Sequence, residues 1–174
     1  MREGGGSGGG AAVNPNKPDK YGQTPILLAA TEGHEGVVQL LLDRKDVKAD
    51  SAEGYGYTPL LCASSRVHEG VMKLLLERED VNINRADKNG QTPLLLTAER
   101  GSAGVVGLLL GWKDINPNMR NSVGQTPLLC AAQGGHAGVV KLLLGRQGVM
   151  PDMPGSDGRT PLSWAALRGH NGVV

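Results

Sequence analysis

The sequence predicts an all-α repeat solenoid whose helix-turn-helix units carry projecting β-hairpin loops. Thr-Pro occurs five times at intervals of 34 residues, with threonines at Thr24, Thr58, Thr92, Thr126 and Thr160. A glycine stands two residues before each threonine, and a Gly-Val pair begins twelve residues after it. Three-leucine runs recur in the same register at residues 40–42, 74–76, 108–110 and 142–144. A single spacing shared by so many motifs indicates a repeat array.

The first half of each unit has the residues of a short capped helix. Thr24 is a favoured N-cap residue, because its hydroxyl accepts a hydrogen bond from a free backbone N–H of the first turn. Pro25 suits the first helical position, where its missing N–H costs nothing. We expect residues 26–30 to continue the helix and Gly33 to end it in the left-handed conformation, which glycine adopts without a Cβ penalty.

The second half of each unit predicts another short helix, which begins near His34 and Glu35 and contains the apolar residues of 37–42. Helices of two to three turns do not persist alone in water. Each unit must therefore bury its apolar faces against its neighbours, so that the stability of the array is a sum over adjacent units. About fifteen residues rich in Pro, Asn, Asp and Gly then lead to the next Thr-Pro and predict a projecting turn or β-hairpin.

A 34-residue period is also typical of tetratricopeptide repeats, whose units consist almost entirely of two long helices. Between Leu42 and Thr58, however, the chain contains Asp43, Asp46, Asp50, Gly54 and Gly56. This segment leaves no room for long helices, which excludes the tetratricopeptide alternative.

Composition narrows the class of partner. The chain of 174 residues has 18 Lys plus Arg and 17 Asp plus Glu, a net charge of +1, which gives no electrostatic reason to expect nucleic acid or an anionic membrane. No apolar run approaches the roughly 18–20 residues that span a bilayer, and none resembles a signal peptide. Two cysteines are too few for a disulfide framework, which favours a cytoplasmic location.

We divide the chain into a flexible Gly-rich linker at residues 1–12 and a repeat domain at residues 13–174. The domain begins with half a hairpin, residues 13–23. Four units and a truncated fifth follow at residues 24–57, 58–91, 92–125, 126–159 and 160–174. The fifth unit lacks its leucine run, so we expect its helix to be loosely held and the chain to be a fragment of a longer array.

One unit departs from the pattern at the turn between its helices. Val67 stands where the other units have Gly33, Gly101, Gly135 and Gly169. A β-branched residue in the left-handed region costs roughly 1–2 kcal/mol. Either the turn has a different backbone in this unit, or it is strained and Val67→Gly raises the melting temperature.

Residues with reactive side chains recur at scaffold positions. His34, His68, His136 and His170 are in register, and packed helices stand about 8–10 Å apart, so we expect a structural role between helices and no shared metal ion. Cys62, Cys130 and Trp164 share another position, where we expect small core thiols, too far apart for a disulfide, and a packed indole. No pattern indicates Ser-His-Asp or Cys-His catalysis. We therefore expect no enzymatic activity, no metal and no cofactor.

The motifs resemble a known family. Thr-Pro-Ile-Leu-Leu-Ala-Ala at residues 24–30, Gly33-His34, residues 37–42 and Asp80-Val81-Asn82 resemble the ankyrin repeat, and the resemblance extends over residues 13–174. The period of 34 differs from the usual period of about 33. The family's His after Thr-Pro-Leu is replaced here by Leu27, Leu61, Leu95, Leu129 and Ser163. Segments such as residues 77–82 resemble the ankyrin arrays of large fungal receptor-type proteins.

The resemblance implies where a partner would bind. Ankyrin proteins usually bind partners along their hairpin tips and the exposed side of their first helices. In this chain those positions vary between units and include tyrosine and arginine, which are enriched at binding hot spots. The candidate partner-binding residues are Tyr21, Tyr55, Tyr57, Arg66, Lys88, Asn89, Gln91, Arg100 and Gln125. The alternative is that the arginines only complement helix dipoles and that the tyrosines are chance surface residues.

These observations predict a non-catalytic protein–protein interaction module that binds another protein on the concave face formed by hairpin tips and first helices. We expect a monomer that binds no nucleic acid, no membrane and no small-molecule substrate. One alternative is a structural or engineered scaffold fragment with no native partner. Another is the regulatory segment of an enzyme whose catalytic domain lies elsewhere.

Overall fold

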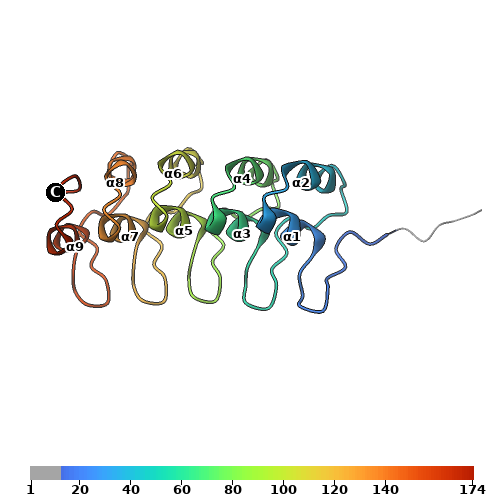
Figure 1. Ribbon diagram of the computed structural model, residues 1–174, viewed down its shortest axis with the longest axis horizontal. Coiled ribbons are helices and arrows are strands. Elements are labelled where there is room, and N and C mark those ends of the chain that lie inside the picture. The colour runs from blue at the N-terminus through green and yellow to red at the C-terminus, as the bar shows by residue number, and fades with distance from the viewer. Residues whose placement is uncertain (1–12) are drawn as a thin grey trace, which may run out of the picture.

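The computed structural model describes residues 13–174, which form nine α-helices in two rows (Figure 1). The first row contains α1 (Pro25–Glu32), α3 (Pro59–Arg66), α5 (Pro93–Glu99), α7 (Pro127–Gln133) and α9 (Pro161–Arg168). The second row contains α2 (Glu35–Leu42), α4 (Glu69–Leu76), α6 (Ala103–Leu110) and α8 (Ala137–Leu144). The predicted linker at residues 1–12 lies outside the described residues.

Each first-row helix begins at the predicted threonine cap. The Oγ1 atom of Thr58, for example, accepts a hydrogen bond from the Leu61 N–H at 3.2 Å, and Pro59 occupies the first helical position. The turn from each first-row helix to the second-row helix that follows contains a residue in the left-handed conformation, such as Gly33 with φ 74°. Val67 keeps this conformation with φ 61°, so the turn after α3 has the ordinary backbone and carries the strain expected for valine.

Successive helix pairs stack side by side. The first-row helices pack in series from α1 to α9, and in the second row α2 packs on α4 and α6 on α8. The gap between α4 and α6 is less closely packed than those two. Buried leucines from both rows form one core that runs along the array, including Leu60, Leu94 and Leu128 in the first row and Leu75, Leu109 and Leu143 in the second. The all-helical repeat solenoid predicted from the sequence is thus confirmed.

The loops between helix pairs project together to one side of the array (Figure 1). Within residues 13–174 they contain no β-strand, although they fold back as hairpins. In the loop before α3, Glu53 N–H donates to the Tyr57 carbonyl at 3.1 Å and Gly56 N–H to the Glu53 carbonyl at 2.9 Å. One backbone hydrogen bond joins such a loop to its neighbour, for example the bond from Lys88 N–H to the Tyr55 carbonyl at 3.1 Å. So few backbone bonds make a turn and not a strand ladder.

Candidate functional site

A groove of about 640 Å³ lies between the first two projecting loops and the first-row helices beside them. Its apolar floor comes from three successive helices, with Cys62 in α3 and Leu96 in α5 at equivalent positions and Leu27 in α1 one residue before that position. Five of the residues predicted from the sequence line this groove, namely Tyr21, Tyr55, Tyr57, Arg66 and Arg100. They come from the loops before α1 and α3 and from the C-terminal ends of α3 and α5, so the stacking of the array brings them together.

The tyrosines stand on loop tips that a carboxylate holds in place. Glu53 Oε1 accepts hydrogen bonds from the backbone N–H groups of Tyr55 at 2.8 Å and Tyr57 at 3.2 Å. Tyr55 is 70% exposed and Tyr21 is 67% exposed, while Tyr57 is half-buried, and burial raises the pKa of its hydroxyl. Exposed aromatic rings on a fixed backbone lose little conformational entropy on binding.

The same arrangement, in which one side-chain oxygen accepts hydrogen bonds from two backbone N–H groups, recurs in the neighbouring loops. Asp87 Oδ1 accepts from the N–H groups of Asn89 at 2.8 Å and Gln91 at 2.9 Å, which fixes two more predicted site residues. The side-chain groups that act in this way stand five positions before Thr-Pro and are the carboxylates of Asp19, Glu53 and Asp87 and the amide oxygen of Asn121. The sequence analysis missed this role, although an acceptor side chain at one repeated position before a glycine turn is a sufficient signal.

Basic side chains line the rim of the groove. Arg66 pairs with Glu32 at 3.5 Å, and both side chains are about half exposed. The Lys88 ammonium lies 5.9 Å from the centre of the Tyr55 ring, within the range of a cation–π interaction. Arg100 is exposed and forms no ion pair with the residues described, 13–174. This leaves a positive charge at the end of the groove.

Gln125 lies outside this groove. Its Nε2 donates to Gln133 Oε1 at 2.8 Å, and its Oε1 accepts from Asn121 Nδ2 at 3.0 Å. It borders a second, smaller hollow of about 170 Å³ that Trp164 also lines. The structure therefore places Gln125 apart from the other predicted residues.

Trp164 and Cys62 differ from their predicted core positions. Trp164 is half-buried, and the Arg159 and Arg168 guanidinium groups lie 5.0 and 5.4 Å from the centre of its ring. This helix position faces the side on which the groove opens, and its first copy, Leu28, is 41% exposed. Only Cys130 is a buried thiol, and burial raises its pKa to about 12.

Three of the four histidines have the structural role that the sequence predicts, whereas His34, in the first unit, is exposed and its side chain makes no such bond within residues 13–174. His68 Nε2 donates to the Thr31 carbonyl of the preceding helix pair at 3.1 Å, and His136 and His170 make equivalent bonds at 3.0 Å. Within residues 13–174, no cluster of His, Cys, Asp and Glu is suited to hold a metal ion. Among the helices of the same residues, none has the length and apolar character needed to cross a membrane.

Stacked helix pairs with loops projecting to one side define a helical repeat protein of the solenoid class. The family model described as Ankyrin repeats (3 copies) matches residues 8–87, 45–121, 71–152 and 98–174. The chain therefore belongs to the ankyrin repeat family. A search of curated proteins gave no match. Ankyrin repeats are generally protein–protein interaction modules, and proteins built from them are typically non-catalytic.

Proposed function

We propose that this chain binds a partner protein through the groove lined by Tyr21, Tyr55, Tyr57, Arg66 and Arg100, which we call the tyrosine groove. One observation carries this proposal. Five of the nine residues that the sequence predicts line one hollow with an apolar floor. Tyrosine and arginine are the residue types most enriched at the energetic centres of interfaces.

The lining indicates the chemistry of the partner segment. Leu27, Cys62 and Leu96 offer an apolar floor for one apolar side chain of the partner. Arg100 has no ion pair within the described part of the chain, so a partner carboxylate would find an unpaired guanidinium there. We therefore propose an extended segment in which an apolar side chain stands next to an acidic one.

The next loop extends the proposed surface. Lys88 and Asn89 are exposed, and Asn89 is tied through its carbonyl to the Ser122 N–H at 2.8 Å. Gln91 is half-buried at the base of the same loop. These residues would contribute to the outer part of the interface, and Gln125 would contribute only if the partner reached the smaller hollow.

Affinity capture tests this proposal. Immobilised wild-type chain would be compared with a Tyr55→Ala, Tyr57→Ala, Arg100→Ala variant in a selection from a displayed peptide library. We expect wild type to select acidic–apolar segments and the triple variant to lose at least about tenfold in affinity for them.

A matched control separates this result from a general loss of structure. A Lys73→Ala, Lys141→Ala variant changes two exposed side chains on the second-row helices α4 and α8. It should bind the selected segments as wild type does. Equal binding by all three chains would refute the tyrosine groove, and the absence of any selected segment would favour a scaffold with no partner.

A further inference from the structure

One position on the loop after each second-row helix carries an arginine in three of the four cases, and this arginine donates hydrogen bonds to the preceding unit. Arg78 Nη1 donates to the Leu42 carbonyl at 3.2 Å and Nη2 to the Val47 carbonyl at 3.3 Å. Its Nε donates to Asp80 Oδ1 at 2.9 Å. Two backbone carbonyls and one carboxylate thus form a binding site for a guanidinium group.

The same arrangement occurs one unit earlier. Arg44 Nη2 donates to the Val13 carbonyl at 3.3 Å, and Nε donates to Asp46 Oδ1 at 3.1 Å. The carbonyl and the carboxylate stand at the same distances in sequence as they do for Arg78. The guanidinium site is therefore a repeated feature of this array.

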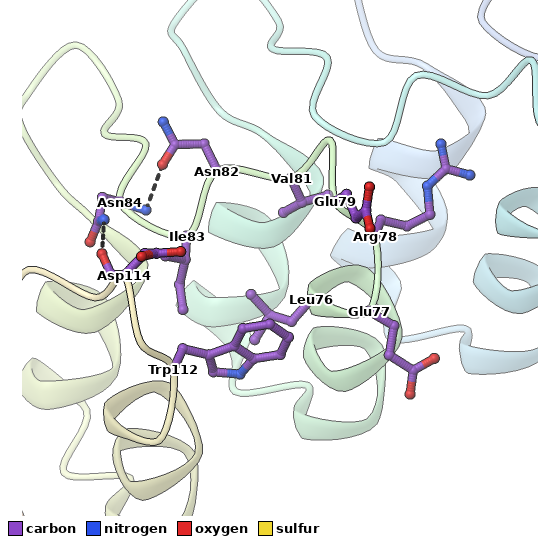
Figure 2. A pocket seen from close by; sticks show the side chains of 10 residues that line it. All are labelled: Leu76, Glu77, Arg78, Glu79, Val81, Asn82, Ile83, Asn84, Trp112 and Asp114. Atoms are coloured by element: carbon purple, nitrogen blue, oxygen red, sulfur yellow. Dashed lines mark hydrogen bonds between the residues drawn. The ribbon is translucent and has the colours of Figure 1, made fainter.

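At the next gap between helix pairs the arginine is replaced by Trp112, but its acceptors remain. The residues equivalent to Leu42, Val47 and Asp80 are Leu76, Val81 and Asp114. All three line a pocket of about 420 Å³ together with Trp112 (Figure 2). The pocket therefore coincides with a guanidinium site that has lost its own arginine.

The packing of the helices keeps this pocket open. It lies at the gap between α4 and α6, which approach each other less closely than α2 and α4 or α6 and α8 do. Trp112 is 40% exposed at the edge of the pocket, beside the buried Leu76. Within residues 13–174, the carbonyls of Leu76 and Val81 accept no backbone hydrogen bond.

The charges around the pocket favour a cation. Glu77, Glu79 and Asp114 line it and are exposed, and none of them forms an ion pair within the described residues. Arg78 also belongs to the lining, but its guanidinium points away from Trp112 toward the preceding helix pair (Figure 2). The pocket thus combines three carboxylates, two carbonyls and an aromatic ring, and Arg78, the one cationic side chain in its lining, is bound to carbonyls of the preceding unit.

We propose that this pocket binds the arginine side chain of a partner peptide. The guanidinium donates to the Leu76 and Val81 carbonyls and to the Asp114 carboxylate, as Arg78 does at the preceding gap, and its face lies against the Trp112 ring. Arginine fits better than lysine, because its planar group carries five N–H donors that can reach several acceptors at once and stacks on aromatic rings.

This arginine pocket is independent of the tyrosine groove. The two sites share no lining residue. They also differ in the sign of their unpaired charge, since the groove presents the Arg100 guanidinium and the pocket presents carboxylates. Failure of one proposal therefore leaves the other intact.

The test uses the full chain and the peptide acetyl-Gly-Arg-Gly-amide, with matched lysine and citrulline peptides. Titration is followed by the backbone amide signals in NMR spectra. We expect saturating shifts at residues 76–84 and 112–116 with the arginine peptide, and an affinity at least about tenfold weaker for the other two. Asp114→Asn should weaken arginine binding by about tenfold.

The decisive variant is Trp112→Arg, which restores the arginine that other units carry. Its guanidinium should fill the pocket, abolish the shifts and leave the melting temperature equal to or above that of wild type. Val123→Ala, an exposed change on the loop before α7, serves as the control and should bind as wild type does. Equal binding of the arginine and citrulline peptides, undiminished binding by Trp112→Arg, or no saturating shift at these residues would overturn the proposal.

Discussion

The imidazole of His136 lies where a side chain at Gly101 would have to be. A Cβ placed on Gly101 would come within 2.5 Å of His136 Nδ1, and Gly101 also has a φ of 72°. Gly33 has the same relationship with His68, and Gly135 with His170, each at 2.7 Å. Glycine is thus required at these turns for two reasons, the left-handed backbone conformation and the histidine ring of the following helix pair.

At the turn after α3, which is also followed by another helix pair, both the glycine and the histidine are replaced. Val67 replaces the glycine, and Ser102, 35 residues later, replaces the histidine. Val67 is half-buried and packs against the hydrophobic core. The smaller serine leaves room for the valine side chain, so that the two departures compensate for each other.

This compensation predicts a coupled pair of substitutions. Ser102→His should lower the free energy of unfolding by more than about 1 kcal/mol in wild type, because the ring meets the Val67 side chain. In a Val67→Gly background the same change should be neutral or stabilising, with a coupling of roughly 0.5–3 kcal/mol. Urea unfolding of the four chains measures the cycle, and strictly additive effects would contradict the compensation.

The steric part of the glycine requirement can be isolated with two alanine variants. Gly101 and Gly169 both have left-handed backbones, with φ 72° and 70°, but a Cβ at Gly169 meets nothing within 4 Å. Both changes should cost the strain of a left-handed alanine, roughly 1–2 kcal/mol. Gly101→Ala should cost at least about 1 kcal/mol more, because the His136 ring must move. Equal losses in thermal unfolding would show that the ring contributes nothing.

Asp50 stands at a position where Asn16, Asn84 and Asn118 each bridge to the next unit. Asn84 Nδ2 donates to the Asp114 carbonyl at 2.7 Å, and its Oδ1 accepts from the Asn116 N–H at 2.8 Å. The Asp50 side chain has no N–H group and so cannot donate the equivalent of the Asn84 Nδ2 bond. Its Oδ1 is buried and has no hydrogen-bond partner among residues 13–174, although its Oδ2 pairs with Arg85 at 2.9 Å. Burial raises the pKa of the Asp50 carboxyl group.

Asp50→Asn should therefore stabilise the fold, by about 1 kcal/mol if the asparagine bridge forms. A raised pKa in the folded state means that the stabilising contribution of Asp50 is present below its ordinary pKa of about 3.9 and is lost as pH rises through the raised value. The advantage of the variant should accordingly grow from about pH 4 to pH 7. Urea unfolding across this range measures it.

Asp46 provides a control, because its pKa is shifted in the direction opposite to that of Asp50. A hydrogen bond from Arg44 lowers the pKa of the Asp46 carboxyl group, so its contribution is present above the ordinary pKa and is lost as pH falls. Asp46→Asn should lower stability at pH 7 and have less effect in acid. If both variants showed the same pH trend, burial would not be the cause at Asp50.

The two thiols should react at different rates. Burial raises the pKa of both thiols, and that of Cys130 to about 12, but Cys130 is buried whereas Cys62 is half-exposed and lines the tyrosine groove. Because the thiolate is the reactive form and must be accessible, iodoacetamide should modify Cys62 before Cys130 in the native protein. Mass spectrometry of digested samples gives both rates. Faster modification of Cys130 would mean that the helix stack opens near α7.

The sequence predicted the elements that depend on local residues. Thr58-Pro59 defines a helix start through contacts within one turn, and Gly33 defines its end through one backbone angle. The position of Trp164 was misjudged because an apolar residue in a short helix can face either the core or the groove. Periodicity does not distinguish the two in a helix of eight residues.

Relationships between units could not be read from one unit alone. The match of Val67 with Ser102 links residues in different helix pairs, and each looks like an isolated defect in its own unit. The pocket at Trp112 has the same origin, because its acceptors, Leu76 and Val81, belong to the preceding unit. Comparing equivalent positions along the stack would have revealed both.

The most direct test of the tyrosine groove is hydrogen exchange of the chain with and without a segment selected on it. Binding should slow the exchange of amides at residues 53–57 and 96–100 and leave those at residues 112–116 unchanged. Protection confined to the second-row helices, or absent from both groove segments, would contradict the proposed binding face.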